Sequence, residues 1–249
     1  MFCNIYKWGD GVAMKRIMFI SALVGVMLPV NSVAQDTGSQ EVIVTAKRSE
    51  GIDYSAAMPV VGLRRSADFA VQEVTITGDT RDGSLRQDEI YKTLANAIAA
   101  APHAGVQIAS GDETLQIVTL ENYRNLSLKK DSRPDSQKLS FLVKAPLGAG
   151  NDARSAQAKI ASFVKVVKPV GRALMETSDD LTFSVVAPDQ YRGAITDIIA
   201  ADAKSMAAKL GDEYGVEIEG LNRPVEWARS GLSEVLLYIP YKLVIVPKH

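Results

Sequence analysis

A glycine-rich hexapeptide at residues 148–153 is the strongest candidate for chemistry in this sequence. It reads Gly-Ala-Gly-Asn-Asp-Ala, follows an expected strand and opens an expected helix, as the G-x-G-x-x-A dinucleotide motif does. Pro146 and Leu147 separate that strand from the first glycine. A glycine turn with a helix cap at Asn151 or Asp152 produces the same pattern. We therefore expect a capped turn and no bound cofactor.

The chain contains few residues that could bind a metal ion or act as a catalytic nucleophile. There are two histidines, His103 and His249, and one cysteine, Cys3. Residues 78–83, together with Glu89, are spaced like a calcium loop but lack carboxylates at the first and third ligand positions. No G-x-S-x-G segment marks a serine nucleophile. The sequence predicts a protein with no metal, no cofactor and no catalytic residues; an enzyme of another type stays the alternative.

The composition is typical of a folded globular protein. The 249 residues are 47% hydrophobic and 23% charged, which argues against a disordered or low-complexity chain. Basic and acidic residues number 28 and 29, for a net charge of −1. Such a balance argues against a nucleic-acid partner and against a polybasic membrane-binding surface.

Residues 1–34 have the pattern of a leader for export. A basic start at residues 14–16 precedes an almost unbroken apolar run at residues 17–30, and Ser32 and Ala34 suit the −3 and −1 positions of a cleavage site. The run is shorter than the ~20 residues that a helix needs to cross a bilayer. We expect cleavage after Ala34, with a retained anchor as the alternative.

Cleavage after Ala34 defines the expected mature protein and its compartment. It removes Cys3, so the mature chain has no cysteine and no disulfide framework. Met1 and Met14 are both candidates for the first residue. No later segment reaches the ~18 apolar residues of a membrane helix. We expect a protein of the periplasm, at most peripheral to the outer membrane, with no integral span after leader removal.

An extended, β-branched octet follows the leader at residues 41–48 and reads Glu-Val-Ile-Val-Thr-Ala-Lys-Arg. It resembles the TonB box near the mature N-terminus of TonB-dependent receptors. The resemblance implies that the octet pairs with the exposed sheet edge of a TonB-like envelope protein. A first strand of the folded domain, or an adhesive tail, explains the octet equally well. The partner-binding candidates are Glu41, Val42, Ile43, Val44, Thr45 and Ala46.

Hydrophobic periodicity predicts an α+β domain at residues 68–249, after a flexible segment and linker at residues 35–67. Two strand–helix units form a mostly antiparallel or mixed sheet with helices packed on it. The expected strands are 69–77, 106–109, 115–121, 139–144, 181–187, 216–221 and 233–246. The expected helices are 84–101, stopped by Pro102, then 152–167 and 189–212.

The order of these elements resembles the SIMPL domain family, also called domain of unknown function 541. The most similar stretch is an alanine-rich helix at residues 200–210, followed by Tyr-Gly-Val at 214–216, a strand with Glu217 and Glu219, and the strand at 233–246. The usual Gly-x-Gly opening strand is matched only loosely by residues 74–78, and the octet and linker lie outside that domain. The resemblance implies an exported, one-domain α+β protein.

These observations predict a non-enzymatic envelope protein with a SIMPL-like domain for interaction and oligomerisation, linked to a TonB-dependent outer-membrane system through the octet. The expected partners are therefore a TonB-like protein and a second copy of the chain. The alternative is a periplasmic accessory or binding module of a TonB-dependent transporter. A transporter accessory needs the octet, whereas a self-sufficient oligomer does not.

Overall fold

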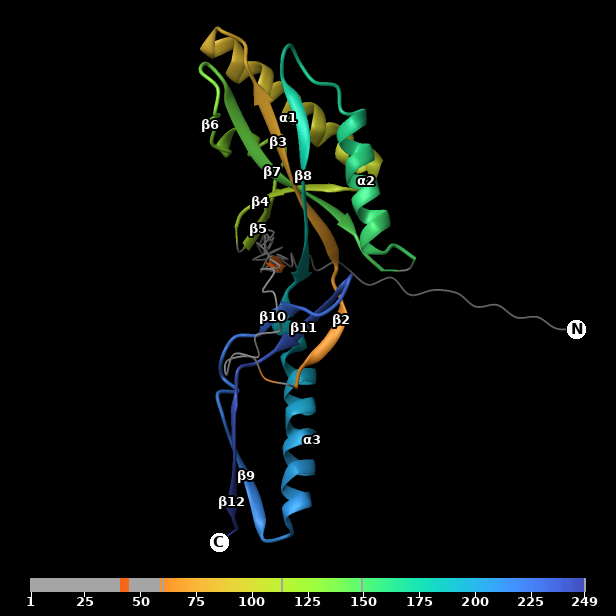
Figure 1. Cartoon of the computed structure of the whole chain (residues 1–249), viewed down its shortest axis with the longest axis vertical. Coiled ribbons are helices and arrows are strands. Elements are labelled where there is room, and N and C mark those ends of the chain that lie inside the picture. The colour runs from red at the N-terminus through yellow and green to blue at the C-terminus, as the bar shows by residue number, and fades with distance from the viewer. Residues whose placement is uncertain (1–40, 45–58, 60, 113, 149, 249) are drawn as a thin grey trace, which may run out of the picture. The chain divides into compact units, whose positions relative to one another are not determined.

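The computed structural model of the chain describes residues 41–44, 59, 61–112, 114–148 and 150–248 (Figure 1). All of them belong to one compact unit, Gly38–His249. The element order is mixed, with helices and strands interspersed along the chain. The predicted leader lies outside the described residues.

The strand β3 (Phe69–Gly78) is the centre of the larger sheet. It pairs antiparallel with β7 (Gln137–Pro146) along its whole length, from Phe69 opposite Pro146 to Gly78 opposite Gln137. Its other edge pairs antiparallel with β8 (Leu174–Val186). The β-branched sequence of β3 favours this extended conformation, and alternate residues such as Val74 and Ile76 are fully buried.

Two helices cover one face of this sheet. Helix α1 (Gly83–Ala104) buries Ile90 and Leu94 against it, and α2 (Ala153–Val166) buries Ile160 and Phe163 in the same hydrophobic core. Aspartates cap both helices: the Asp82 carboxylate accepts from Leu85 N–H and the Asp152 carboxylate from Ser155 N–H, each at 2.8 Å. Amphipathic helices and a β-branched strand therefore share a single core.

The remaining strands complete a seven-stranded sheet in the order β3-β8-β1-β5-β4-β7-β6, in which β3 also pairs with β7. Every pairing of its described strands is antiparallel. The predicted α+β fold class is confirmed. The added strands are β1 (Glu41–Val44), β4 (Gln107–Ser110), β5 (Thr114–Ile117) and β6 (Lys129–Lys130), and the short helix η1 (Tyr123–Asn125) follows β5.

The C-terminal part of the chain forms two smaller sheets beside helix α3. One sheet has the order β10-β11-β2 and the other pairs β12 with β9 (Figure 1). Helix α3 lies against β9 and buries Ile195, Ile199, Ala203 and Ala207. None of the described helices is long and apolar enough to cross a membrane. The elements are β2 (Leu63–Ser66), η2 (Pro188–Tyr191), α3 (Arg192–Leu210), β9 (Tyr214–Glu219), β10 (Glu226–Arg229), β11 (Glu234–Tyr238) and β12 (Lys242–Pro247).

Two predicted boundaries differ from the structure at prolines. The segment expected to be one strand at 233–246 forms two strands. β11 ends before residues 239–241 and β12 begins after them, because Pro240 has no N–H to donate to a neighbouring strand. Helix α1 runs past Pro102 to Ala104 and ends where Gly105 adopts a left-handed conformation, with φ 64°. A glycine in that conformation ends helices readily.

Strand pairing begins earlier in the chain than the predicted domain start at residue 68. The expected linker at 35–67 contains β1 and β2, and β2 pairs with β11 from Ser66 opposite Glu234 to Leu63 opposite Leu237. The Arg65 guanidinium pairs with Asp68 at 2.6 Å and lies over the Tyr191 ring, 4.5 Å from its centroid. A four-residue strand of sequence Leu-Arg-Arg-Ser has no apolar alternation by which the sequence could reveal it.

The turn after α2 depends on a glycine at residue 171. Its φ is +59°, and a Cβ there would lie 2.0 Å from Oε1 of Glu89, a buried side chain on α1. The other carboxylate oxygen of Glu89 accepts from Thr80 Oγ1 at 2.5 Å and from Arg172 N–H at 3.3 Å. This carboxylate ties the turn to α1.

We expect Gly171→Ala to lower the free energy of unfolding by about 2–4 kcal/mol, because it adds backbone strain and displaces the buried Glu89 carboxylate. Gly193→Ala in α3 is the matched control, since nothing lies within 4 Å of its Cβ. It should leave stability unchanged or raise it by up to about 1 kcal/mol. Urea denaturation measures both; equal effects would contradict the proposed close contact.

The Tyr238 hydroxyl provides a prediction at alkaline pH. Burial raises the pKa of Tyr238 to about 12, with a smaller contribution from the Glu226 carboxylate on the paired strand β10. Because this pKa lies above the ordinary value of 10, the stabilisation is complete below pH 10 and is lost as pH rises to about 12. In Tyr238→Phe, the fall in the free energy of unfolding between pH 10 and about pH 12 should be smaller than in the wild type by about 2–3 kcal/mol. Glu226→Gln should remove a smaller part, as measured by urea denaturation at pH 9–12.

Candidate functional site

The predicted partner-binding segment is partly described by the structure. Glu41–Val44 form β1, with β8 on one edge and β5 on the other. Glu41 lies opposite Val186 of β8 and Leu115 of β5, and Val42 lies opposite Val185 and Thr114. Thr45 and Ala46 lie outside the described residues. The first four candidates are therefore a strand within the sheet of their own chain.

The Glu41 carboxylate is bound on both of its oxygens. Lys144 Nζ, from β7, donates to Oε2, and Ser184 Oγ, from β8, donates to Oε1 at 2.5 Å. The exposed fractions of the whole residues are 8% for Glu41, 1% for Lys144 and 0% for Ser184. Three strands thus each contribute one side chain to a buried, charge-assisted hydrogen-bond cluster, which we call the Glu41 cluster.

The surroundings of the Glu41 cluster are mainly apolar. The Lys144 ammonium lies over the Phe69 ring, 4.2 Å from its centroid. Lys144 lies directly opposite the buried Val71 on β3, and Leu115 of β5 lies directly opposite Glu41. Side chains that are opposite in register share a face of the sheet. The cluster therefore occupies the face of the sheet opposite the two helices.

Burial makes this ion pair unlike the other ion pairs of the described residues. Its side chains are 1% and 10% exposed, whereas each of the other pairs has at least one side chain exposed by 25% or more. Removing two charges from water is costly, and mutual attraction repays the cost only when hydrogen bonds are complete. The Ser184 hydroxyl and the Phe69 ring supply the additional partners of the two charges.

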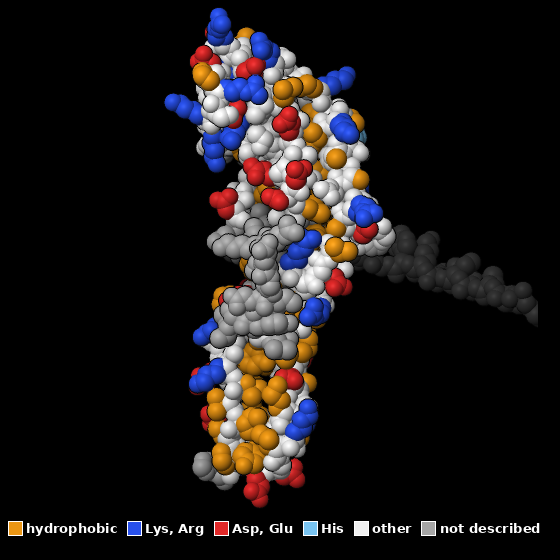
Figure 2. Space-filling model, in the orientation of Figure 1, with side chains coloured by type: hydrophobic (Ala, Val, Ile, Leu, Met, Phe, Trp, Pro, Cys, Tyr) orange, Lys and Arg blue, Asp and Glu red, His pale blue; other side chains and the backbone are white. Residues whose placement is uncertain are grey.

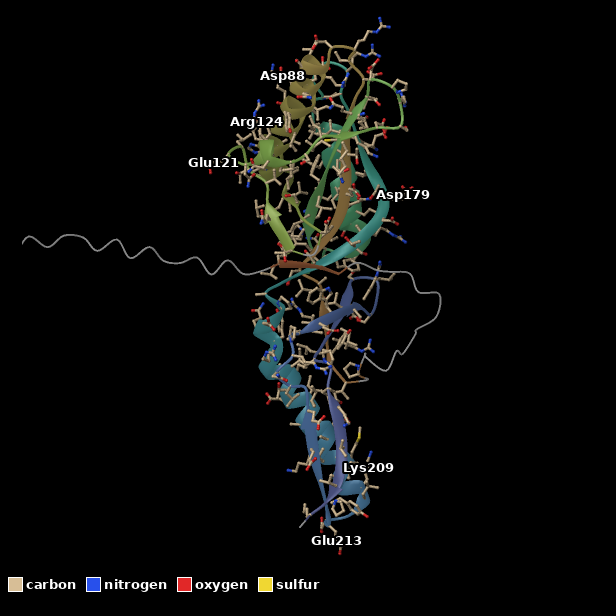
Figure 3. All side chains as sticks on the ribbon, turned by 90° about the vertical axis from the view of Figure 1, so that its left-hand side faces the viewer. Asp88, Glu121, Arg124, Asp179, Lys209 and Glu213 are labelled. Atoms are coloured by element: carbon tan, nitrogen blue, oxygen red, sulfur yellow. The ribbon has the colours of Figure 1, made fainter. Side chains whose placement is uncertain are left out.

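The Glu41 cluster links β1 to β7 and β8 through side-chain hydrogen bonds. The carboxylate and the ammonium neutralise each other, and the backbone of β1 is paired on both edges. Within the described part of the chain, no group of three His, Cys, Asp or Glu side chains could hold a metal ion. Figure 3 shows other charged side chains, among them Asp88, Glu121 and Asp179, on separate elements and pointing outward.

A second candidate surface is an apolar groove between α3 and β9, which we call the α3–β9 groove. Its volume is about 410 Å³, and hydrophobic side chains gather on this part of the molecule in Figure 2. Alanines line the α3 side and small or branched residues line the β9 side. The apolar lining includes Ala200, Ala203, Ala207, Ala208, Val216 and Ile218, and the charged lining consists of Lys204, Asp212 and Lys248.

The described residues of the glycine motif, 148 and 150–153, form a capped turn. Gly148 and Asn151 exchange backbone hydrogen bonds at 3.1 and 2.9 Å. At the start of α2, Ala153 N–H donates to Ser233 Oγ at 3.0 Å and Ser155 N–H donates to the Asp152 carboxylate. Every described neighbour of the preceding strand β7 is antiparallel, whereas a dinucleotide fold has parallel ones. The backbone N–H groups of Gly148, Asn151, Ala153 and Ser155 thus donate to protein oxygens.

A scan of the chain against protein-family models finds no matching model, and a search of the curated proteins finds no significant match. The resemblances to the SIMPL domain and to the TonB box therefore stay predictions.

Ser184→Ala tests the Glu41 cluster. Loss of the hydroxyl leaves one buried oxygen of Glu41 without its donor, so the free energy of unfolding should fall by about 1–3 kcal/mol. Ser178→Ala is the matched control on the same strand, because its hydroxyl only approaches the Asp180 carbonyl at 3.5 Å. Its effect should stay within about 0.5 kcal/mol. Equal denaturation midpoints for both variants would contradict the cluster.

Proposed function

We propose that this protein is a non-enzymatic, exported envelope protein whose α+β domain is an interaction module that associates with further copies of itself. The observation that carries the proposal is the α3–β9 groove, an exposed apolar surface beside an open strand edge. The leader pattern at residues 1–34 supports export to the periplasm. The SIMPL resemblance supports the same class of protein.

The sheet of β9 and β12 has edges that a second copy can use. It contains two strands, so each has one edge without a strand partner among the described residues. The exposed side chains of β9 include Glu217 and Glu219, while Lys242 and Lys248 lie in and directly after β12. Within the chain, Lys242 Nζ lies 3.6 Å from Glu219 Oε2.

This charge distribution favours a head-to-tail arrangement. When β12 of a second copy pairs with the open edge of β9 in the register that these strands have within the chain, Lys242 lies across from Glu219. When two β9 strands pair with each other, glutamates lie across from glutamates, which is unfavourable. Head-to-tail contacts of this kind produce rings or filaments rather than two-fold dimers.

The α3–β9 groove supplies the apolar part of such a contact. Ala208 and Ala200 are exposed on its α3 side, and Tyr214, at the start of β9, is 39% exposed. Covering these atoms removes apolar surface from water, at about 25 cal/mol per Å². Four alanines and two glycines line the groove, so an apolar side chain of the second copy can approach the backbone of α3 and β9 there.

A second candidate function is that of an accessory module for a TonB-dependent transporter. The observation that favours it is that residues 41–44 do form a strand that pairs through its backbone. In the structure, that strand pairs within its own chain. A TonB-like partner would therefore have to compete with β5 and β8.

Ala208→Glu tests self-association. We expect the mature wild-type protein to be an oligomer at micromolar concentration and the variant to sediment as a monomer, because a buried carboxylate without a partner disfavours the contact. Ala201→Glu is the matched control, since it is an exposed alanine of α3 outside the groove. It should keep the wild-type mass in analytical ultracentrifugation. A monomeric wild type, or equal behaviour of the two variants, would contradict the proposal.

A further inference from the structure

We propose that the gap between β8 and β5 is a strand-binding site that selects an extended peptide with a carboxylate at its first position. Residues 41–44 are the releasable occupant of this site. This inference does not depend on self-association of the chain. It concerns the Glu41 cluster and the strand pairings around it, which lie apart from the α3–β9 groove.

The sheet does not need β1 for its continuity. The strand order places β1 between β8 and β5, while a separate pairing joins β3 to β7. Without β1, the pairings β8–β3, β3–β7, β7–β4 and β4–β5 still connect the other long strands. Departure of β1 therefore opens two edges without cutting the sheet apart.

The helix-covered core is centred on the long strands. The hydrophobic core that α1 and α2 share with the sheet includes residues of β3, β7 and β8, such as Val74, Phe141 and Phe183. Glu41 lies in the cluster on the opposite face. The pairings of β3 with β7 and β8 that carry this core do not involve β1.

Lys144 and Ser184 form the part of the site that remains when β1 leaves. Both are anchored in long strands, β7 and β8, and both have their polar atoms directed at the position of the Glu41 carboxylate. Edge strands recognise any extended backbone, so the ladder alone gives little selectivity. A buried ammonium adds selectivity, because only a peptide with a carboxylate at the matching position neutralises it.

Release has opposite consequences for the two members of the ion pair. Glu41 travels with β1 and regains water, whereas Lys144 stays in β7 beside Phe69. When Lys144 is replaced by methionine, the bound state of β1 contains an unpaired buried carboxylate, and the released state contains a hydrated one. Lys144→Met should therefore shift β1 toward release and leave the helix-covered core in place.

Occupancy of the site controls the octet. Both edges of β1 are used by β8 and β5, so residues 41–44 cannot pair with the sheet edge of another protein while they are inserted. A partner that binds the octet must therefore compete with β8 and β5 for residues 41–44. A peptide that binds in the gap displaces residues 41–44 and makes them accessible to such a partner. The site thus couples one strand-pairing event to another.

Hydrogen exchange of the full mature chain tests the release of β1. In the wild type, amides of residues 41–44 should exchange about tenfold faster than those of β3 and β7. In Lys144→Met, exchange of β1 should rise by about a further hundredfold while β3 and β7 change little. If β1 exchanges in step with β3 and β7 in both proteins, or if Lys144→Met unfolds the whole domain, β1 is an integral strand and the proposal fails.

A peptide-binding measurement tests the selectivity of the site. Val42→Pro disables the resident strand in the full chain, because Val42 is paired with both β8 and β5 and proline removes its N–H. The probe is a fluorescent peptide of sequence Glu-Val-Ile-Val-Thr-Ala-Lys-Arg, and its control has glutamine in place of the glutamate. The glutamate peptide should bind about tenfold more tightly in fluorescence anisotropy. Equal binding of the two peptides, no binding of either, or global unfolding of the variant would each overturn the proposal.

Discussion

The antiparallel ladder of β3 with β7 on one edge and β8 on the other is the constraint on which the larger sheet depends. Because the register pairs Phe69 with both Pro146 and Ser184, the N-terminal end of β3 holds together residues that are far apart in the chain. Lys144 lies beside this end, opposite Val71. The same ladder presents Val74 and Ile76 to the helices. A single register therefore fixes the helix-covered core and the face that carries the Glu41 cluster.

The two faces of the sheet are stabilised by different interactions. The helix face is apolar, and its packing tolerates many side chains of similar volume. The opposite face contains a charged pair where hydrophobic residues would serve stability as well or better. A one-residue slip of β1 would turn Glu41 away from Lys144 and leave both charges without partners. We infer that the Glu41 cluster fixes the register of β1 in the gap, a property that an apolar pair would not provide.

Periodicity in the sequence predicted the elements that are long and amphipathic. Strand β3, helices α1, α2 and α3 and strand β7 all appear, and the α+β class is confirmed. Short strands such as β2 and β10 have no recognisable pattern, and Pro240 divided a run that alternation alone made continuous. The Glu41 cluster joins residues separated by 103 and 143 positions. Periodicity assigns a residue to a face but does not name its neighbours across strands, so the partners of Glu41 could not be predicted.

The edge of β9 and the edge of β8 are protected from unwanted strand pairing in two different ways. Exposed edges invite indiscriminate pairing, and charged side chains are the usual protection. On β9, Glu217 and Glu219 are such charges, and Lys242 of β12 lies 3.6 Å from Glu219. In the proposed head-to-tail assembly, these charges disfavour pairing of β9 with β9 and favour pairing of β9 with β12. Beside β8, the edge is covered by β1, and the buried Lys144 restricts what can replace it. In both proposals a charge decides which strand is accepted, because backbone hydrogen bonds alone accept any strand.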